Sequence, residues 1–294
     1  MLGAQLALNA VSLGAAYALV AIGFVLVLNA TTAVNFAHGE SVIAGGFAAV
    51  ALAMLLPVGT AIPGVVLLPG VLLLTAGLGL AIAGLAYLPI RKRPPVSVFV
   101  TTIAFGIIVT NGLNAAFGAA PRTAPALLGT GTVEFLGVAA SRQSLAIIAT
   151  AVLLVGALAF VLQRTQLGRQ FRACAQDPEM ARALGIRLTR ITLLAFALGT
   201  AFAGAAGLLL AHQFFVTPSD GAALILKAYI AVVIGGWGSL RGAALGAMLI
   251  AFFEVGVASV SSQPLAEGLL YVAVLLVLLI RPDGIFGEPL RLRA

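Results

Sequence analysis

The sequence has few charged residues and almost no cysteine. Of its 294 residues, 9% are Asp, Glu, Lys or Arg and 62% are hydrophobic, and the mean hydropathy is +1.16. Soluble domains carry about 25% charged residues, so this composition excludes a soluble globular protein and predicts an integral membrane protein. The single cysteine, Cys174, excludes an intramolecular disulfide. We interpret it as a small filler residue.

The sequence also lacks a polar linker and the common catalytic patterns. Without a linker to divide it, the chain from residue 1 to 294 is predicted to be a single transmembrane domain. It contains no His-Glu-x-x-His pattern, no serine nucleophile elbow and no acidic metal-binding pair. We therefore expect no catalytic residues, no metal site and no cofactor bound by this chain. The first apolar segment has no basic residue before it, so we interpret it as a helix rather than a cleaved signal peptide.

Long apolar segments fill most of the chain. A helix needs about 20 apolar residues to cross the hydrocarbon core of a membrane, and nine segments are candidates. They predict an all-α polytopic bundle of about eight to nine transmembrane segments. The seventh segment is short, and whether it crosses the membrane or is re-entrant stays open. The segments are Gln5–Leu28, Val34–Leu56, Val65–Ile90, Val96–Gly118, Ser144–Gln163, Thr189–Ala211, Ala222–Gly236, Ala243–Val260 and Pro264–Ile280.

Basic residues gather in three of the connections, at 91–93, at 164–190 and near the C-terminus. Positive charge in short loops marks the cytoplasmic side of a membrane protein. We therefore expect these connections and the C-terminus to be cytoplasmic, and the N-terminus and residues 119–143 to lie outside. Topology accounts for the net charge of +7, so no nucleic-acid partner is needed to explain it.

Two apolar octapeptides resemble each other. AYALVAIG at 16–23 and AYIAVVIG at 228–235 share five of eight residues. They are consistent with two weak parallel repeats, an arrangement that transporters use. Chance matches between apolar octapeptides are common, so the duplication stays open.

The longest hydrophilic stretch, 164–190, contains the signals of a short helix. The Asp177 side chain can cap free backbone N–H groups, Pro178 suits the first helical position and Glu179 favours the positive end of the helix dipole. Gly185 is placed to end the helix. We expect a capped, arginine-rich cytoplasmic helix, which either connects two spans or docks a cytoplasmic partner.

Four motifs, in order along the chain, carry a resemblance. EMARALG at 179–185 is similar to the Glu-Ala-Ala-x-x-x-Gly signature of ABC importer permeases, with Met180 in place of the first alanine. NFAHGE at 35–40, GGWGSLRGAALGA at 235–247 and RPDGIFG at 281–287 resemble further motifs of one branch of these proteins. The chain therefore resembles the inner-membrane permeases of the high-affinity branched-chain amino acid uptake family. Arg241 departs from the proline that members often carry there.

The resemblance implies a subunit without an ATPase of its own. Such a permease sits in the bacterial inner membrane and pairs with a second permease, as a heterodimer or homodimer. It binds two cytoplasmic ATP-binding subunits, which carry the ATP, and receives substrate from an outer substrate-binding protein. The helix at 177–184 would then be the coupling helix that contacts the ATPase. The residues implied in coupling are Asp177, Pro178, Glu179, Ala181, Arg182, Leu184 and Gly185.

The function that follows is a pathway for ATP-driven import of branched-chain or related amino acids. The alternatives are a urea or amide permease of the same family and an ion-coupled secondary transporter. Polar residues inside apolar segments usually face an interior or an aqueous cavity, so they are the pathway or gating candidates. They are Asn35, His38, Glu40, Thr110, Asn111, Asn114, Lys227 and Glu254.

Each group of candidates has a second interpretation. We place Asn35 at the cytoplasmic end of its span, where the cluster Asn35–Glu40 is expected to have a structural or gating role rather than direct substrate contact. The fourth segment's polar face is expected to bond neighbouring helices rather than line a pathway. Lys227 and Glu254 can form a buried ion pair. The structural turn after the seventh segment comprises Gly235, Gly236, Gly238 and Gly242.

Overall fold

The computed structural model describes residues 2–55, 63–129, 131–135, 138–281 and 284. Within them, seven helices are long and apolar enough to cross a membrane, and two further apolar helices are shorter. The predicted polytopic helical bundle is therefore confirmed. The helices are α1 (Leu2–Thr31), α2 (His38–Met54), α3 (Leu68–Ala81), α4 (Pro95–Phe117), α5 (Arg142–Arg164), α6 (Gln166–Gln176), α7 (Pro178–Ala183), α8 (Leu188–Gln213), α9 (Gly221–Gly235), α10 (Leu240–Ala258) and α11 (Gln263–Ile280).

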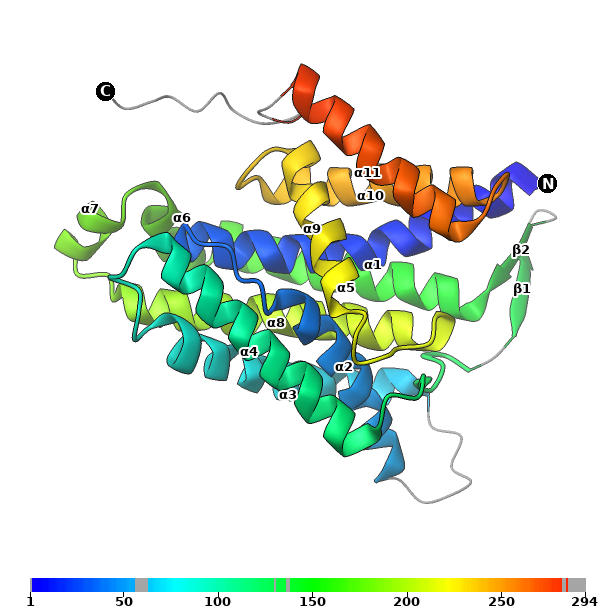
Figure 1. The fold of residues 1–294 in the computed structure, drawn as a ribbon, viewed down its shortest axis with the longest axis horizontal. Helices are drawn as coiled ribbons and strands as arrows, with labels where there is room; N and C mark the ends of the chain where they lie inside the picture. The colour runs from blue at the N-terminus through cyan, green and yellow to red at the C-terminus, as the bar shows by residue number, and fades with distance from the viewer. Residues whose placement is uncertain (1, 56–62, 130, 136–137, 282–283, 285–294) are drawn as a thin grey trace.

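Two features mark opposite ends of the bundle in Figure 1. An antiparallel hairpin of β1 (Thr132–Phe135) and β2 (Val138–Ser141) lies at one end, which we call the hairpin end. The helices α6 and α7 lie at the other, which we call the basic end because arginines of both helices gather there. The hairpin was not predicted, since its short, mixed sequence has no clear alternation of apolar and polar residues.

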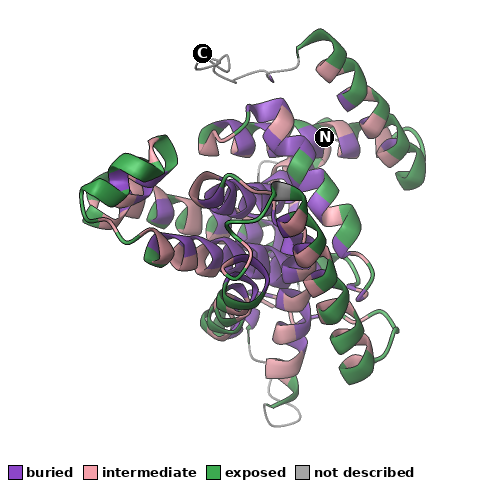
Figure 2. Cartoon of the chain, turned by 60° about the vertical axis from the view of Figure 1, so that its left-hand side comes forward, coloured by how far each residue is buried: buried purple, intermediate pink, exposed green. Residues whose placement is uncertain are grey.

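The two central helices are α1 and α8. Their most apolar windows are 94% and 78% buried, whereas the windows of α4 and α11 are each 17% buried. Small residues allow the central pair to touch: a Cβ added to Gly23 would lie 2.4 Å from the carbonyl oxygen of Gly199. Glycine contacts of this kind are how membrane helices approach closely. Figure 2 shows the buried residues at the centre and exposed faces on the surrounding helices.

The second span differs from its prediction. Val34–Leu56 was expected to be one continuous helix, but α2 begins only at His38. Before it, α1 ends at Thr31, and Thr32 adopts the left-handed conformation with a φ of 54°. That conformation is uncommon for residues other than glycine, and here it turns the chain back into the bundle.

A similar break precedes α9. The chain leaves α8 at Gln213, and its next residues form a bridge between Val216 and Arg122 before α9 begins at Gly221. The start of α9 meets the start of α2, since a Cβ on Gly39 would lie 2.0 Å from the carbonyl oxygen of Gly221. The short seventh segment is therefore a half-helix that begins inside the bundle.

The remaining elements are short helical extensions. A 3₁₀ turn, η1 (Gly64–Leu67), leads into α3, and a π-helical stretch, η2 (Ile82–Tyr87), continues it. The two similar octapeptides lie in different settings. Residues 16–23 are in the middle of α1, whereas 228–235 end at the glycine turn after α9. The proposed duplication remains untested.

Candidate functional site

Asn35 shapes the turn that starts α2. Its Oδ1 accepts a hydrogen bond from the Ala37 N–H at 3.1 Å, and its carbonyl oxygen accepts one from the His38 N–H at 3.3 Å. The adjacent Phe36 N–H donates to the Thr102 Oγ1 of α4 at 3.2 Å. Non-helical backbone is tolerated at membrane depth only where protein surrounds it or it lines a cavity. The three hydrogen bonds give the backbone N–H groups of Phe36, Ala37 and His38 the partners that they require there.

His38 fixes the depth of the turn. Its ring is fully buried, and its Nε2 lies 3.0 Å from the carbonyl oxygen of Val20. Because a carbonyl only accepts, Nε2 carries the proton. Val20 lies eleven residues before the end of α1 at Thr31, which is about 16 Å at the rise of an α-helix. The cluster therefore lies near the middle of the bundle, and its predicted position at the end of a span is wrong.

Glu40 opens onto a cavity of about 250 Å³. The cavity lies between α2, α4 and the first turn of α9, and two glycines leave room for the carboxylate. A Cβ on Gly106 would lie 3.2 Å from Glu40 Oε2, and one on Gly221 would lie 3.1 Å from Glu40 Oε1. The lining residues are Phe36, Glu40, Ile103, Ile107, Thr110, Asn111, Ala222 and Ile225.

The fourth segment divides its polar residues between two roles. Thr110 and Asn111 line the Glu40 cavity, and the Asn111 amide also donates to the Ile107 carbonyl at 2.8 Å. Thr101 instead donates to the Ala86 carbonyl of η2 at 2.9 Å. Asn114 does not line the cavity. Thr110 and Asn111 therefore line the cavity, whereas Thr101, nine residues earlier on the opposite side of α4, bonds a neighbouring helix.

Several polar atoms of the Asn35–Glu40 stretch have no protein partner. Within the described residues, five buried side-chain nitrogen or oxygen atoms make no hydrogen bond, and three belong to this stretch: Asn35 Nδ2, His38 Nδ1 and Glu40 Oε2. Buried polar groups without partners are costly, so their concentration in six residues makes this stretch the candidate site.

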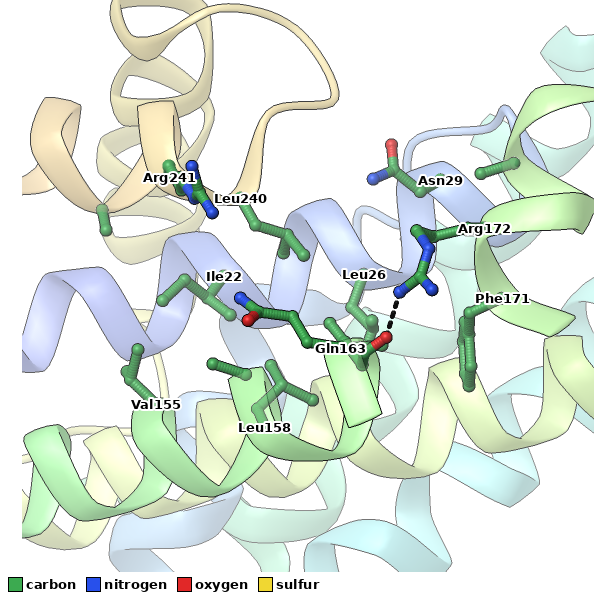
Figure 3. A pocket seen from close by; sticks show the side chains of 14 residues that line it. Ile22, Leu26, Asn29, Val155, Leu158, Gln163, Phe171, Arg172, Leu240 and Arg241 are labelled. Atoms are coloured by element: carbon green, nitrogen blue, oxygen red, sulfur yellow. Dashed lines mark hydrogen bonds between the residues drawn. The ribbon is translucent and has the colours of Figure 1, made fainter. Parts of the chain in front are cut away.

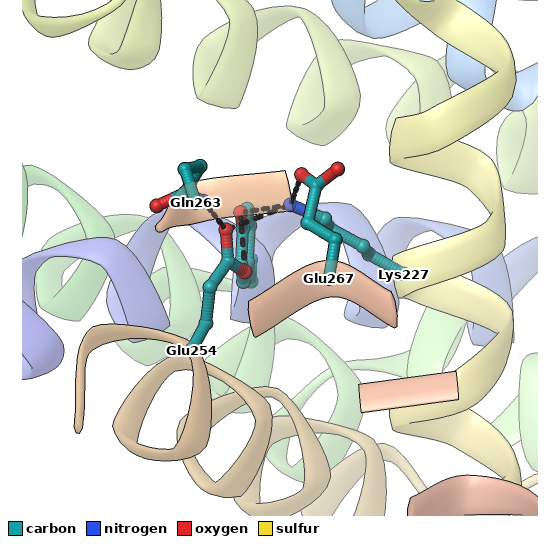
Figure 4. A network of polar contacts seen from close by, with 5 residues as sticks. Lys227, Glu254, Gln263 and Glu267 are labelled. Atoms are coloured by element: carbon teal, nitrogen blue, oxygen red, sulfur yellow. Dashed lines mark hydrogen bonds and ion pairs between the residues drawn. The ribbon is translucent and has the colours of Figure 1, made fainter. Parts of the chain in front are cut away.

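Lys227 lies at the centre of a second polar cluster (Figure 4). Its Nζ is 2.9 Å from Glu254 Oε1, 2.9 Å from Glu267 Oε1 and 3.0 Å from the Tyr17 hydroxyl. Gln263 completes the cluster by donating to Glu254 Oε1 at 2.6 Å. The ion pair between Lys227 and Glu254 is therefore present, and the cluster around it joins α9 to α1, α10 and α11.

Three members of this cluster were missed by sequence reasoning. Glu267 and Gln263 are four residues apart on α11 and so share one face, which was the available signal. Tyr17 lies within the octapeptide at 16–23 and was not among the candidates. The Lys227 cluster and the Glu40 cavity are not one site, because none of the residues that line the cavity belongs to the cluster.

The glycine turn connects α9 to α10 compactly. Gly236 and Gly238 have φ values of 100° and 80°, a region that favours glycine. Ser239 caps α10 by accepting the Gly242 N–H at 3.0 Å. A Cβ on Gly235 would lie 2.0 Å from the Gly242 carbonyl oxygen, so the turn requires small residues. Arg241 occupies the first turn of α10, and its side chain is exposed.

The helix α7 has the predicted caps. Asp177 Oδ1 accepts the N–H groups of Glu179 and Met180, both at 3.0 Å. Pro178 opens the helix, and Gly185 ends it with a φ of 81°. Glu179, Arg182 and Leu184 are exposed, and Ala181 is buried.

A second helix in this loop, α6, was not predicted. Its signal was present: Leu167, Phe171 and Cys174 recur at helical spacing, and Thr165 Oγ1 caps the start by accepting the Gly168 N–H at 3.3 Å. Phe171 and Cys174 are buried in the same cluster as Ala181. Through α6, the short α7 is therefore fixed to the bundle rather than suspended on a flexible loop.

Comparison with known proteins identifies the family. The model of the family described as branched-chain amino acid transport system / permease component matches residues 6–279. The chain belongs to this family. The resemblance seen in the four motifs is thereby confirmed, although most of the motif at 281–287 lies outside the described residues.

Relatives of nearly the same length support the assignment. The chain is 32% identical to the high-affinity branched-chain amino acid transport system permease protein BraD of Pseudomonas aeruginosa, covering 97% of this chain and 96% of the relative. It is 31% identical to the permease protein LivH of Escherichia coli K12, covering 96% and 94%. A shorter match, 34% identical over 47% of this chain, is to the autoinducer 2 import system permease protein LsrC of Escherichia coli.

Two polar residues at the end of α8 lie at the hairpin end. His212 Nδ1 lies 3.0 Å from the Ala124 carbonyl at the hairpin end, and Gln213 lines a neighbouring pocket. Among the described residues, no group of three or more His, Cys, Asp or Glu side chains lies close enough to hold a metal ion.

Proposed function

We propose that this branched-chain amino acid permease-family protein imports branched-chain amino acids in an ATP-driven complex. The observation that carries the proposal is the capped α7, fixed to the end of a bundle that contains the Glu40 cavity at mid-depth. In the inner membrane, the basic end would face the cytoplasm, so the N-terminus would lie outside and the C-terminus inside. Separate subunits would bind and hydrolyse ATP.

Coupling to those subunits would occur at α7. The exposed residues of α7 and its C-cap include the apolar Met180 and Leu184, which fit a groove on a partner better than water. Glu179 and Arg182 add charges of both signs. Because α6 links α7 to the core through Phe171 and Cys174, a push on α7 would move the bundle rather than be absorbed by a loop.

The substrate pathway would pass the Glu40 cavity. Half-helices that meet near the middle of a membrane form the binding sites of many transporters, and α2 and α9 meet here. Glu40 would pair with the ammonium group of an amino acid, and Thr110 and Asn111 would bind its polar atoms. Ile103, Ile107 and Ile225 would contact a branched apolar side chain.

A second permease would complete this pathway. The cavity is partly open, and α4 on its outer side is the least buried of the long helices together with α11. Asn111 is exposed, which is costly against lipid tails. A heterodimer or homodimer that covers α4 would enclose the cavity between two subunits.

Uptake into proteoliposomes tests this function. The purified complex is reconstituted with ATP inside and the substrate-binding protein outside, and uptake of leucine, valine and urea is compared. We expect leucine and valine uptake that requires both ATP and the binding protein. Uptake of urea but not of leucine or valine would show that the substrate class is wrong. Uptake without ATP would contradict the proposal of an ATP-driven importer.

The coupling role is tested separately. Glu179→Lys reverses an exposed charge on α7, and Gly185→Pro cannot adopt the positive φ at the helix end. Both should weaken co-purification of the ATPase and lower uptake. Arg169→Gln, on the exposed side of α6, serves as the control. Undiminished uptake and binding in both variants would refute the coupling role.

A further inference from the structure

A groove at the basic end is not explained by transport of an amino acid. It encloses about 340 Å³ and lies over the second half of α1, between α5 and α6 on one side and α10 on the other (Figure 3). It shares no residue with the Glu40 cavity. The residues that line it are Ile22, Leu26, Asn29, Val155, Leu158, Ala159, Leu162, Gln163, Phe171, Arg172, Ala175, Leu240, Arg241 and Ala244.

The floor of the groove is apolar. Ile22 and Leu26 of α1 face Val155 and Leu158 of α5, with no charged residue between them. An apolar cavity of this kind does not hold ordered water, because a water molecule needs polar partners. The groove therefore suits a hydrocarbon occupant.

The rim of the groove carries two arginines from different helices. Arg172 comes from α6 and Arg241 from α10, and Figure 3 shows both guanidinium groups beside the apolar floor. The Arg172 guanidinium also donates to the Leu162 carbonyl, which holds it at the rim. Planar guanidinium groups with several fixed donors match phosphate oxygens well.

The residues that line the groove lie at different depths along α1. Arg172 and Asn29 are near the end of α1, whereas Ile22 lies nine residues before Thr31, about 13 Å deeper. Arg172 and Asn29 thus lie at the level of lipid head groups and Ile22 at the level of acyl chains, and Figure 3 shows Arg241 farther along the groove, beside Ile22. Basic pockets between membrane helices bind anionic lipid head groups.

We propose that this groove binds an anionic phospholipid. Its phosphate lies against Arg172, and one acyl chain lies along Leu26, Leu158 and Ile22. The bound lipid joins α6 to α10, which the protein itself leaves separated by the groove. It therefore supports the α6–α7 pair from the membrane side, whichever substrate the permease carries.

Native mass spectrometry of the purified complex tests the site. The complex is titrated with phosphatidylglycerol and with phosphatidylcholine of the same chains. Wild type is expected to retain phosphatidylglycerol preferentially, and Arg172→Gln should lower that affinity about fivefold. Arg169→Gln, which changes an α6 arginine outside the groove, should retain wild-type binding. Equal losses in the two α6 variants would overturn the proposal.

A second, independent test of the lipid site fills the groove with a bulky side chain. Ala159→Trp occupies the apolar floor without changing charge and should displace the tightly bound lipid, whereas Leu153→Trp on the exposed face of α5 should not. A second permease is the competing occupant. If Ala159→Cys, in a Cys174→Ser background, cross-links efficiently to another subunit of the complex, that subunit fills the groove and the lipid site is refuted.

Discussion

The His38 ring lies 3.0 Å from the carbonyl oxygen of Val20, which is in the middle of the longest helix. This contact holds the start of α2 inside the bundle. His38 also packs edge-to-face on Phe24, with 5.9 Å between the ring centroids. One side chain thus sets the depth at which the chain re-enters the membrane.

We expect His38→Ala to destabilise the complex by about 3 kcal/mol, because it removes a fully buried ring and leaves a cavity. His38→Phe keeps the ring and loses the hydrogen bond, which costs about 1 kcal/mol. The measurement is the thermal unfolding midpoint of the purified complex, with the partly buried His212→Phe as the control. Equal midpoints for wild type and His38→Ala would contradict this role.

Glu40→Gln tests the pathway. The amide keeps the shape of the carboxylate but cannot pair with an ammonium group, so leucine uptake should fall about 10- to 100-fold, as expected for a hydrogen bond to a charged group. The unfolding midpoint should change little. Asn114→Ala lies on α4 outside the cavity and should transport normally, whereas Asn111→Ala should not. Normal uptake by Glu40→Gln would place the pathway elsewhere.

Lys227→Met tests the second cluster. It leaves Glu254, which is 2% exposed, without its cation, and breaking a buried pair costs about 3–5 kcal/mol. Adding Glu254→Gln should restore much of the loss, because the uncompensated charge is removed. Glu267→Gln should cost about 1 kcal/mol or less, since its side chain is 37% exposed. Additive effects of Lys227→Met and Glu254→Gln would show that the pair is not coupled.

The Asp177 cap is expected to matter for coupling. Asp177→Ala removes the acceptor of two N–H bonds and costs the short helix about 1 kcal/mol. Leucine-stimulated ATPase activity should fall, while Asp177→Ser, which still caps, should retain it. Both activities are measured in the reconstituted complex. A fall of the same size in both variants would show that charge, not capping, is required.

Cys174 is the single cysteine of the sequence, so its chemical labelling measures how well α6 stays packed without an engineered cysteine. Burial raises the pKa of its thiol, so less thiolate is present at neutral pH than for a free cysteine. Maleimide labelling should be slow and should continue to accelerate above pH 9, where a free thiol has already ionised. Cys174→Ser gives the background. If labelling at neutral pH is as fast as for free cysteine, α6 does not stay packed.

Local sequence signals predicted a large part of this molecule. The nine apolar segments correspond to helices, and Asp177, Pro178 and Gly185 marked the bounds of α7 because a cap, a first-turn proline and a positive φ are local requirements. The family motifs came from the same kind of short pattern. Each of these features depends on residues that are neighbours in the sequence.

The depth of Asn35–Glu40 could not be predicted in this way. Nothing in Thr32–Ala37 distinguishes a return into the bundle from the end of a span; the difference comes from Val20, Thr102 and Gly221, which are distant in sequence. The Lys227 cluster likewise draws Glu267 from another helix. Tertiary contacts, rather than propensity, decide both.

The two half-helices also bear on how the protein is made. The 17 residues of α2 and the 15 of α9 are short for independent crossing, and the non-helical segments before them bring polar backbone to mid-membrane. That backbone has no partner in lipid. Phe36 bonds to Thr102, which is synthesised later, and Val216 bonds to Arg122, which is synthesised much earlier. We therefore expect the α2 segment to settle only after α4 has been inserted, so that biogenesis of this chain is an assembly of helices around α1 rather than a sequence of independent insertions.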